Sequence, residues 1–157
     1  MSHQYVLIAL LVGVCFAALL VGEWNKRRVA LALMGNWSAC TAFIILSGIA
    51  DAWHWFLAVD FVTALVVLWP SAGRWQALIG ITYLAQIGAH GIYGMTILPM
   101  EMGVYLRWLD LFFIAQLALL GSWAGGDLVK AAHRWTDARR DTRAAAAHRK
   151  GVGGEGK

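Results

Sequence analysis

The sequence predicts an all-α integral membrane bundle of five transmembrane helices, followed by a basic amphipathic C-terminal helix. Of the 157 residues, 60% are hydrophobic and only 14% are charged, and the mean hydropathy is +0.61. A soluble domain usually carries about 25% charged residues. Five apolar stretches each have roughly the 17–25 residues that a membrane-spanning helix needs. This composition excludes a disordered chain, a disulfide scaffold and an ordinary cytosolic enzyme.

The five expected spans follow one another with short connections and form one domain over residues 1–124. The first has no basic region before it and no small-residue cleavage site after it, so we expect a retained helix rather than a signal peptide. The third is short and has Asp60 near its middle. Gly125 and Gly126 are expected to end the fifth. The predicted spans are 5–21, 29–50, 53–69, 75–98 and 103–124.

The distribution of positive charge predicts the orientation. Lys and Arg number 13 against 9 Asp and Glu, and the whole excess lies in the tail from Gly125 onward. With five spans, every Lys and Arg except Arg107 falls on the same side as this tail. Cytoplasmic segments are enriched in Lys and Arg. We therefore expect a multi-pass protein of the bacterial inner membrane with its N-terminus outside and its C-terminus inside.

Residues 125–157 are expected to form a basic cytoplasmic tail with a helix over about 127–150, in which Asp127 is the N-cap. Apolar residues recur at helical spacing while basic residues occupy the other faces, which is typical of a helix that lies on anionic lipid headgroups. The alternative is a solvated helix that only enforces the topology. The pI near 9.4 is thus attributed to contact with lipid, and no nucleic-acid partner is expected. The basic surface residues are Lys130, Arg134, Arg140 and Arg143.

Four ionisable residues fall inside the predicted spans, where such residues are costly and indicate a functional site. At a rise of about 1.5 Å per residue, Asp60, His90 and Asp110 each lie roughly 10–12 Å below the outer interface. Arg107 is three residues before Asp110, so the two are expected to pair along one helix. Asn36 is expected to lie deeper and outside this cluster.

Polar and small residues surround His90 on the fourth span. Spacing of three and four residues places four polar side chains on one helix face. Glycines that bracket His90 are expected to let another helix backbone approach closely. The polar residues are Tyr83, Gln86, His90 and Tyr93, and the glycines are Gly88, Gly91 and Gly94.

Three interpretations of the cluster remain open. The first is a structural salt-bridge network in which Arg107 neutralises Asp60 and Asp110. The second is a proton or cation path, because chains of Asp and His form proton relays. The third is a divalent-metal site made of Asp60, His90 and Asp110; since no helical H-x-x-x-H motif supports it, the main expectation is no metal.

No nucleotide-binding glycine pattern, zinc-ligand spacing or nucleophile elbow is present in the sequence. We therefore expect no catalytic residues, no enzymatic activity and no cofactor. Cys15 and Cys40 both lie in apolar runs, so they are interpreted as small buried hydrophobic residues.

One stretch carries a resemblance. Asp60 in mid-helix, Arg74 and Trp75 adjacent at the next helix start, and Gln86 four residues before His90 resemble small polytopic membrane proteins of proteobacteria and their phages. The stretch covers about one fifth of the chain. The resemblance implies a location in the membrane and no activity. The small size and the charged tail also resemble phage holins in layout, without a shared motif.

The sequence thus predicts a non-enzymatic inner-membrane protein whose polar cluster in the outer leaflet handles a proton or a cation. A holin-like permeabilising protein and an accessory subunit of a membrane complex are the alternatives. The expected partners are the lipid bilayer, with anionic lipids at the tail, and either a second copy of the chain or a membrane complex.

Overall fold

The computed structural model describes residues 2–48, 52–69, 73–95 and 102–152, and the side chains of residues 5–140 within those ranges. These residues form helices and contain no strand, which confirms the predicted all-α class. The helices are α1 (Ser2–Val21), α2 (Trp24–Ser47), α3 (Trp53–Leu68), α4 (Arg74–Met95) and α5 (Met102–Val152).

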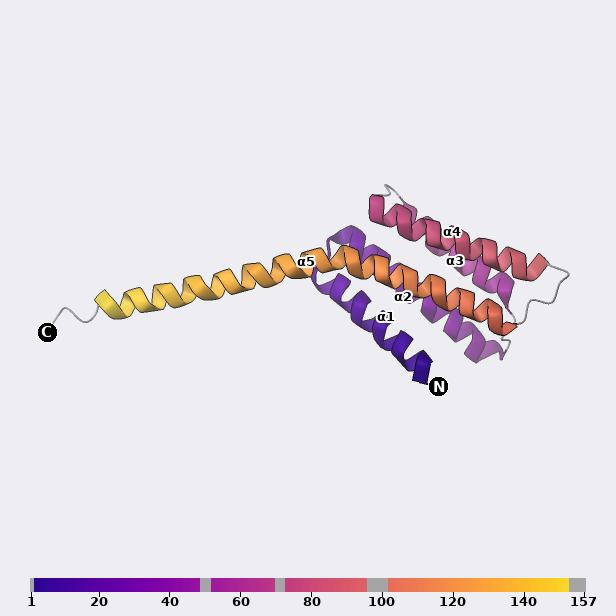
Figure 1. The fold of residues 1–157 in the computed structure, drawn as a ribbon, viewed down its shortest axis with the longest axis horizontal. Coiled ribbons are helices and arrows are strands. Elements are labelled where there is room, and N and C mark those ends of the chain that lie inside the picture. The colour runs from indigo at the N-terminus through magenta and orange to yellow at the C-terminus, as the bar shows by residue number, and fades with distance from the viewer. Residues whose placement is uncertain (1, 49–51, 70–72, 96–101, 153–157) are drawn as a thin grey trace.

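The five helices lie side by side in one bundle (Figure 1), and their contacts close into a ring. Each helix packs against the next one in the chain, and α5 returns to pack against α1. A smaller contact joins α2 to α5 across the ring. Short connections make neighbouring helices antiparallel; only Gly22 and Glu23 separate α1 from α2.

Local hydrogen bonds explain where α2 ends and where α4 begins. α2 ends at Gly48, whose φ of 66° lies in the left-handed region, and its N–H donates to the Ile44 carbonyl at 3.0 Å. Glycine is the usual residue in this position because it has no Cβ. At the start of α4, the N–H of Gly73 donates to Oε1 of Gln76 at 2.9 Å. Nε2 of the Gln76 side chain in turn donates to the Val67 carbonyl at 3.3 Å, which ties α4 to the end of α3.

α5 continues without a break through Gly125 and Gly126 and leaves the bundle as a long extension (Figure 1). The expected helix end, and a separate tail helix capped by Asp127, are therefore wrong. Two interior glycines cost a helix only about 1 kcal/mol each. The Asp127 side chain is paired with Lys26 on α2 instead of capping a helix. The extension thus leaves in line with α5 rather than folding back onto the bundle end.

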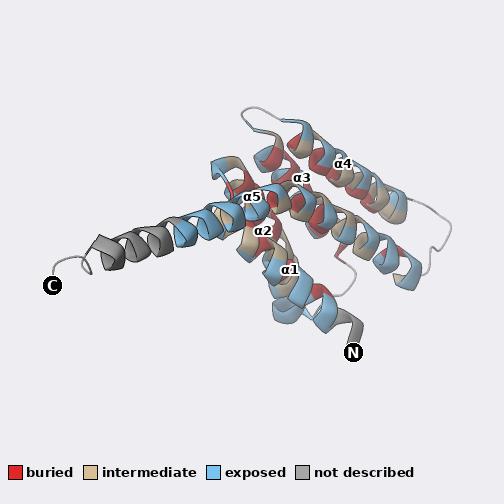
Figure 2. Cartoon of the chain, turned by 60° about the vertical axis from the view of Figure 1, so that its left-hand side comes forward, coloured by how far each residue is buried: buried red, intermediate tan, exposed pale blue. Residues whose placement is uncertain are grey.

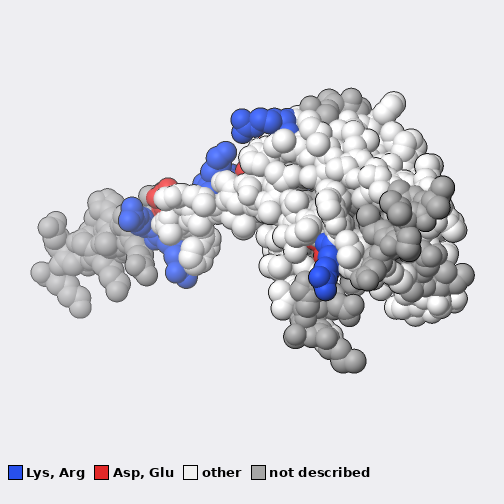
Figure 3. Space-filling model, turned by 45° about the vertical axis from the view of Figure 1, so that its right-hand side comes forward, with Lys and Arg blue, Asp and Glu red and all other residues white. Residues whose placement is uncertain are grey.

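Burial is concentrated inside the ring, and the outward faces carry large apolar side chains (Figure 2). By length and composition, α2 and the segment Met102–Arg140 of α5 could cross a membrane, while Tyr5–Val21 and α3 are apolar but shorter. Basic side chains gather on the extension and at the bundle end from which it leaves (Figure 3). Apolar side chains that are more than half exposed occur on every helix, among them Phe16, Leu31, Phe61, Ile81 and Leu111.

The half of the ring nearest the extension is filled by an apolar core. Residues of all five helices meet there and leave almost no exposed area. Of the two free cysteines, Cys15 is buried in this core and Cys40 is partly buried. The central members of the core are Ala18, Val29, Leu33, Val67, Ile79 and Leu120.

Candidate functional site

A chain of buried hydrogen bonds crosses the other half of the ring. Nε2 of His90 lies 2.7 Å from Oδ2 of Asp60, and Nδ1 of His90 lies 2.5 Å from the Tyr105 hydroxyl. Asn36 donates from Nδ2 to Oδ1 of Asp60 at 2.7 Å. The side chains come from α2, α3, α4 and α5, and Asp60, His90 and Tyr105 are at most 2% exposed. This chain of hydrogen bonds therefore links four helices in the interior.

A second set of bonds holds the Asp60 end of this chain in position. Thr63, one helical turn after Asp60, accepts a hydrogen bond from Asn36 at 3.0 Å. The Thr63 hydroxyl donates to the carbonyl of Val59 at 2.8 Å. Asn36 thus contacts two consecutive turns of α3, and the carboxylate is fixed from both of its oxygens.

The hydrogen bonds around His90 can be made with one ring nitrogen as donor and the other as acceptor. Nε2–H then donates to the carboxylate, and Nδ1 accepts from the Tyr105 hydroxyl. The hydrogen bond at one nitrogen sets the tautomer at the other. An imidazole between a carboxylate and a phenol can gain a proton on one side and release one on the other, which is the chemistry of a proton relay.

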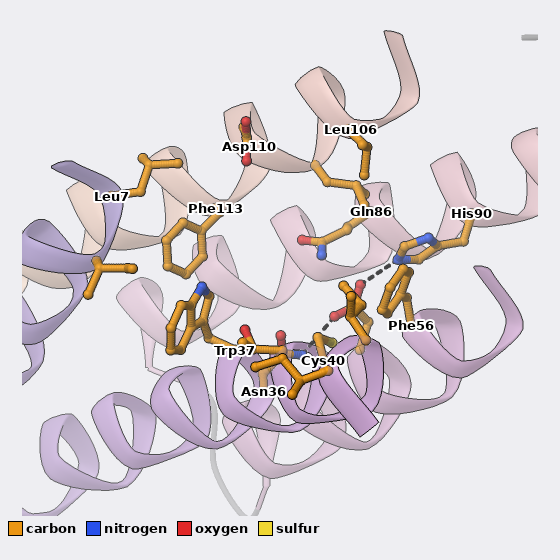
Figure 4. A pocket seen from close by; sticks show the side chains of 16 residues that line it. Leu7, Asn36, Trp37, Cys40, Phe56, Gln86, His90, Leu106, Asp110 and Phe113 are labelled. Atoms are coloured by element: carbon orange, nitrogen blue, oxygen red, sulfur yellow. Dashed lines mark hydrogen bonds and ion pairs between the residues drawn. The ribbon is translucent and has the colours of Figure 1, made fainter. Parts of the chain in front are cut away.

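The hydrogen-bonded network borders a cavity of about 440 Å³ between the helices (Figure 4). The cavity is partly open to the surface, where Ile45 and Leu106 at its edge are exposed. All five helices contribute to its wall, and it lies in the half of the bundle away from the α5 extension. In Figure 4, Asp110 on α5 stands across the space from Asn36 and Cys40 on α2. Most of the wall is apolar or aromatic. The polar lining residues are Asn36, Thr41, Asp60, Gln86, His90 and Asp110.

A second buried polar pair lies beside this chain of hydrogen bonds. Nε2 of Gln116 on α5 donates to Oε1 of Gln86 on α4 at 2.9 Å. One helical turn before Gln86, Tyr83 is 1% exposed and belongs to the apolar core that fills the remaining half of the ring. The polar residues that border the cavity therefore end at about the level of this pair, although Gln76 and Lys26 are buried nearer the extension.

The polar face predicted on α4 points into the ring. Tyr83, Gln86 and His90 are all buried. Tyr93 is partly buried and stacks on Tyr105, with ring centroids 4.0 Å apart and an angle of 10° between the planes. The structure therefore places this face against α3 and α5, and His90 directly contacts the Asp60 carboxylate.

Arg107 does not take the position that the salt-bridge hypothesis requires. Its side chain is exposed, and among the described residues it forms no ion pair with Asp60 or Asp110. Asp110 is partly buried and lines the cavity. The carboxylate of Asp60 is held by His90 and Asn36 in its place.

The metal-site alternative lacks support in the described part of the chain. No three His, Cys, Asp or Glu side chains gather there closely enough to hold a metal ion. Asp60 and His90 touch, but Asp110 stands apart on α5. The three residues therefore do not form a ligand set.

Sequence reasoning missed three members of the site: Asn36, Tyr105 and Gln116. Asn36 was assigned to a deeper layer, but α2 begins at Trp24 rather than Val29, so this residue sits near the middle of its helix. Tyr105 and Gln116 are eleven residues apart, close to three helical turns. That spacing places both residues on one face of α5, and it could have identified them as a pair of inward-facing polar residues from the sequence.

An ion pair closes the opposite end of the ring, near the extension. The Lys26 ammonium contacts the Asp127 carboxylate, and it also lies 5.5 Å from the centroid of the Trp123 ring. Both charged side chains are largely buried. The hydrogen bond from Lys26, together with its positive charge, lowers the pKa of the Asp127 carboxyl below its usual range. This contact fixes the point at which α5 leaves the bundle.

The predicted surface residues of the tail lie on the extension. Lys130, Arg134 and Arg140 are exposed, and Arg143 lies outside the residues whose side chains are described. The guanidinium of Arg139 lies 3.9 Å from the centroid of the Trp135 ring. The extension therefore presents basic and aromatic groups together.

Comparisons of the chain with protein families, with curated proteins and with solved structures found no match.

Proposed function

We propose that the chain is a small multi-pass protein of the bacterial inner membrane whose buried Asp60–His90 pair takes up and passes on a proton. In this proposal all five helices cross the bilayer, with the N-terminus outside and the extension of α5 inside. The observation that carries the proposal is the fully buried His90 imidazole, engaged at both nitrogens by Tyr105 and Asp60 beside a partly open cavity between the helices.

The surface of the ring supports immersion in lipid. Large apolar side chains cover the outward faces of all five helices, whereas a water-exposed surface rarely carries such a continuous apolar area. α3 has 16 residues, or about 24 Å, which is shorter than a typical hydrocarbon core of about 30 Å. Local thinning of the bilayer accommodates a short span. Trp53 and Trp69 at its two ends suit the two membrane interfaces.

The apolar core on the extension side determines how such a protein would work. Below Gln86 and Gln116 most buried side chains are apolar. The buried polar residues on that side, Gln76 and Lys26, bond to Gly73, Val67 and Asp127 and not to Gln86 or Gln116. A proton that reaches Asp60 from the cavity can therefore cross only if the helices rearrange. We expect a carrier-like rate that saturates, rather than conduction through an open pore.

The extension favours a second candidate function, that of an accessory subunit of a membrane complex. It projects from the bundle with Leu128, Val129 and Trp135 exposed. Such a helix offers an apolar and basic surface to a cytoplasmic partner or to anionic lipids. Copurification of a stable membrane complex that is lost when residues 128–157 are deleted would favour this role.

Topology is tested first, because the proposal depends on it. A reporter active only in the cytoplasm is fused at the C-terminus and, separately, after Glu101. The proposal predicts an active C-terminal fusion and a silent fusion at Glu101. The opposite pattern would contradict the five-span topology.

The proton function is tested in liposomes with a pH-sensitive dye inside. The wild-type protein should collapse an imposed pH gradient faster than empty liposomes do, and Asp60→Asn should abolish this effect. Asp137→Asn removes an exposed carboxylate from the extension and serves as the matched control. Equal rates for the wild-type protein and empty liposomes would overturn the proposal. Release of a trapped fluorescent dye would instead indicate a holin-like pore.

A further inference from the structure

The carboxylate of Asp110 is left without a counter-charge inside the ring. It lines the cavity, and within the described parts of the chain it has neither an ion-pair partner nor a hydrogen bond. Arg107, one turn earlier, is exposed. A carboxylate in a low-dielectric environment requires a partner. The space next to the Asp110 carboxylate, where a partner could bind, is the cavity.

The walls of the cavity indicate what kind of partner fits. Trp37, Phe56 and Phe113 lie on three different helices, and in Figure 4 Trp37 and Phe113 lie together at one side of the space with Phe56 at the other. Aromatic rings attract cations through their faces. Among the described lining residues there is no Lys or Arg, so the fixed charges of the wall, Asp60 and Asp110, are acidic. The cavity therefore favours a cation and disfavours an anion.

Gln86 offers a ligand in the cavity a hydrogen-bond donor. The side chain is 91% buried and lines the cavity, and its Oε1 is occupied by Gln116. Its Nε2 group has no acceptor among the described residues, and in Figure 4 it points into the space. A ligand that bears an oxygen acceptor near its apolar body would satisfy this donor.

We propose that this cavity binds a monovalent amphipathic organic cation. Its charged group lies next to Asp110, and its apolar body fills the space between the aromatic walls. A volume of about 440 Å³ matches the range of about 300–1,000 Å³ typical of small-molecule sites. An inorganic divalent ion would need several oxygen or nitrogen ligands close together, and no such cluster exists in the described part of the chain.

The site shares a wall with the Asp60–His90 pair but depends on a different carboxylate. Binding does not require that a proton crosses the membrane. A protein that binds the cation but fails the liposome experiment would remove the proposed proton function and keep the binding site. A protein that moves protons but ignores the cation would do the reverse.

The test uses the full-length protein in detergent and equilibrium dialysis of two radiolabelled probes. Tetraphenylphosphonium and tetraphenylborate have the same shape and opposite charge. We expect saturable binding of one tetraphenylphosphonium per chain, and no comparable binding of tetraphenylborate. Asp110→Asn should weaken the binding of the cation about tenfold or more, while Asp137→Asn should leave it unchanged.

Two results would overturn the proposal. The first is equal affinity of the wild-type protein for both probes, a comparison that needs no variant and is unaffected if Asp110→Asn fails to fold. The second is a folded Asp110→Asn protein, with the same elution volume as the wild-type protein, that binds tetraphenylphosphonium with unchanged affinity.

Discussion

Nε2 of His90 lies 2.7 Å from Oδ2 of Asp60, across thirty residues of sequence and between two helices. Neither side chain is more than 1% exposed. Removal of one member of such a buried pair leaves polar atoms that water cannot reach. The pair is thus a structural link between α3 and α4, and it is the group to which the proposed function assigns proton exchange.

Asp60→Leu should lower the free energy of unfolding by about 3–5 kcal/mol, the usual effect of breaking a buried pair. The substitution leaves donors of His90 and Asn36 without their acceptor. Adding His90→Leu should restore part of the loss, because the two effects are coupled. Denaturation of the single and double variants in detergent measures the coupling. Strictly additive losses would show that the two side chains do not act as a pair.

Arg107→Gln should change the free energy of unfolding by less than about 0.5 kcal/mol, as is usual for an exposed side chain without a partner. The same unfolding measurement in detergent applies. Arg107→Lys, which keeps the charge, is the control. A loss of about 3 kcal/mol or more would indicate instead that Arg107 neutralises a buried carboxylate.

Asp127→Asn should lower the free energy of unfolding by about 1–3 kcal/mol at neutral pH, because the Lys26 ammonium loses its charged partner in a largely buried position. Since the pKa of Asp127 is lower in the folded protein, its contribution is present above the unfolded-state pKa of about 3.9. The contribution is lost as the pH falls through the folded-state pKa.

The measurement for this ion pair is the difference in unfolding midpoint between the wild-type protein and Asp127→Asn as the pH is lowered. The difference should shrink toward zero in acid. Asp137→Asn, ten residues further along the same helix and exposed, should show no such trend. A difference that stays constant down to the lowest pH would contradict the assignment.

Alanine substitutions of the glycines around His90 should have two different effects on the stability of the protein. A Cβ at Gly94 would lie 2.5 Å from the Trp53 ring, whereas nothing lies within 4 Å of a Cβ at Gly88 or Gly91. Gly94→Ala should therefore destabilise the protein by about 1–3 kcal/mol through overpacking. Gly91→Ala should stabilise it by up to about 1 kcal/mol through helix propensity. Unfolding of both variants in detergent tests this, and equal effects would contradict the packing of Trp53 on Gly94.

The all-helical class and the inward polar face of α4 could be predicted because both depend on composition and on helical periodicity. Tyr83, Gln86 and His90 repeat at three and four residues, and the helix has no freedom to place them elsewhere. The pairing of partners could not be predicted in the same way. The predicted depth of Asn36 was wrong. Counting residues from a helix end gives the depth of a residue in the membrane only when the ends of the helices lie at the same level.

Two further differences between the sequence predictions and the structure have local causes. The sequence around Gly125 contains strong helix-stop residues, but the contact of Asp127 with Lys26 and the packing of Trp123 favour a continuous α5. Tertiary contacts override such propensities routinely. Arg107 and Asp110 have the spacing of an ion pair, yet one side chain faces outward and the other lines the cavity. Spacing gives proximity along a helix and does not determine which side chain faces the interior.

The most direct test of the proton relay is the rate at which His90→Gln collapses a pH gradient in liposomes. Glutamine can donate to Asp60 and accept from Tyr105, so it preserves hydrogen bonding, but its amide does not take up a proton near neutral pH. The relay predicts a folded variant that elutes as the wild-type protein does, with a rate equal to that of empty liposomes. A folded His90→Gln protein with the wild-type rate would contradict the relay and leave His90 a purely structural residue.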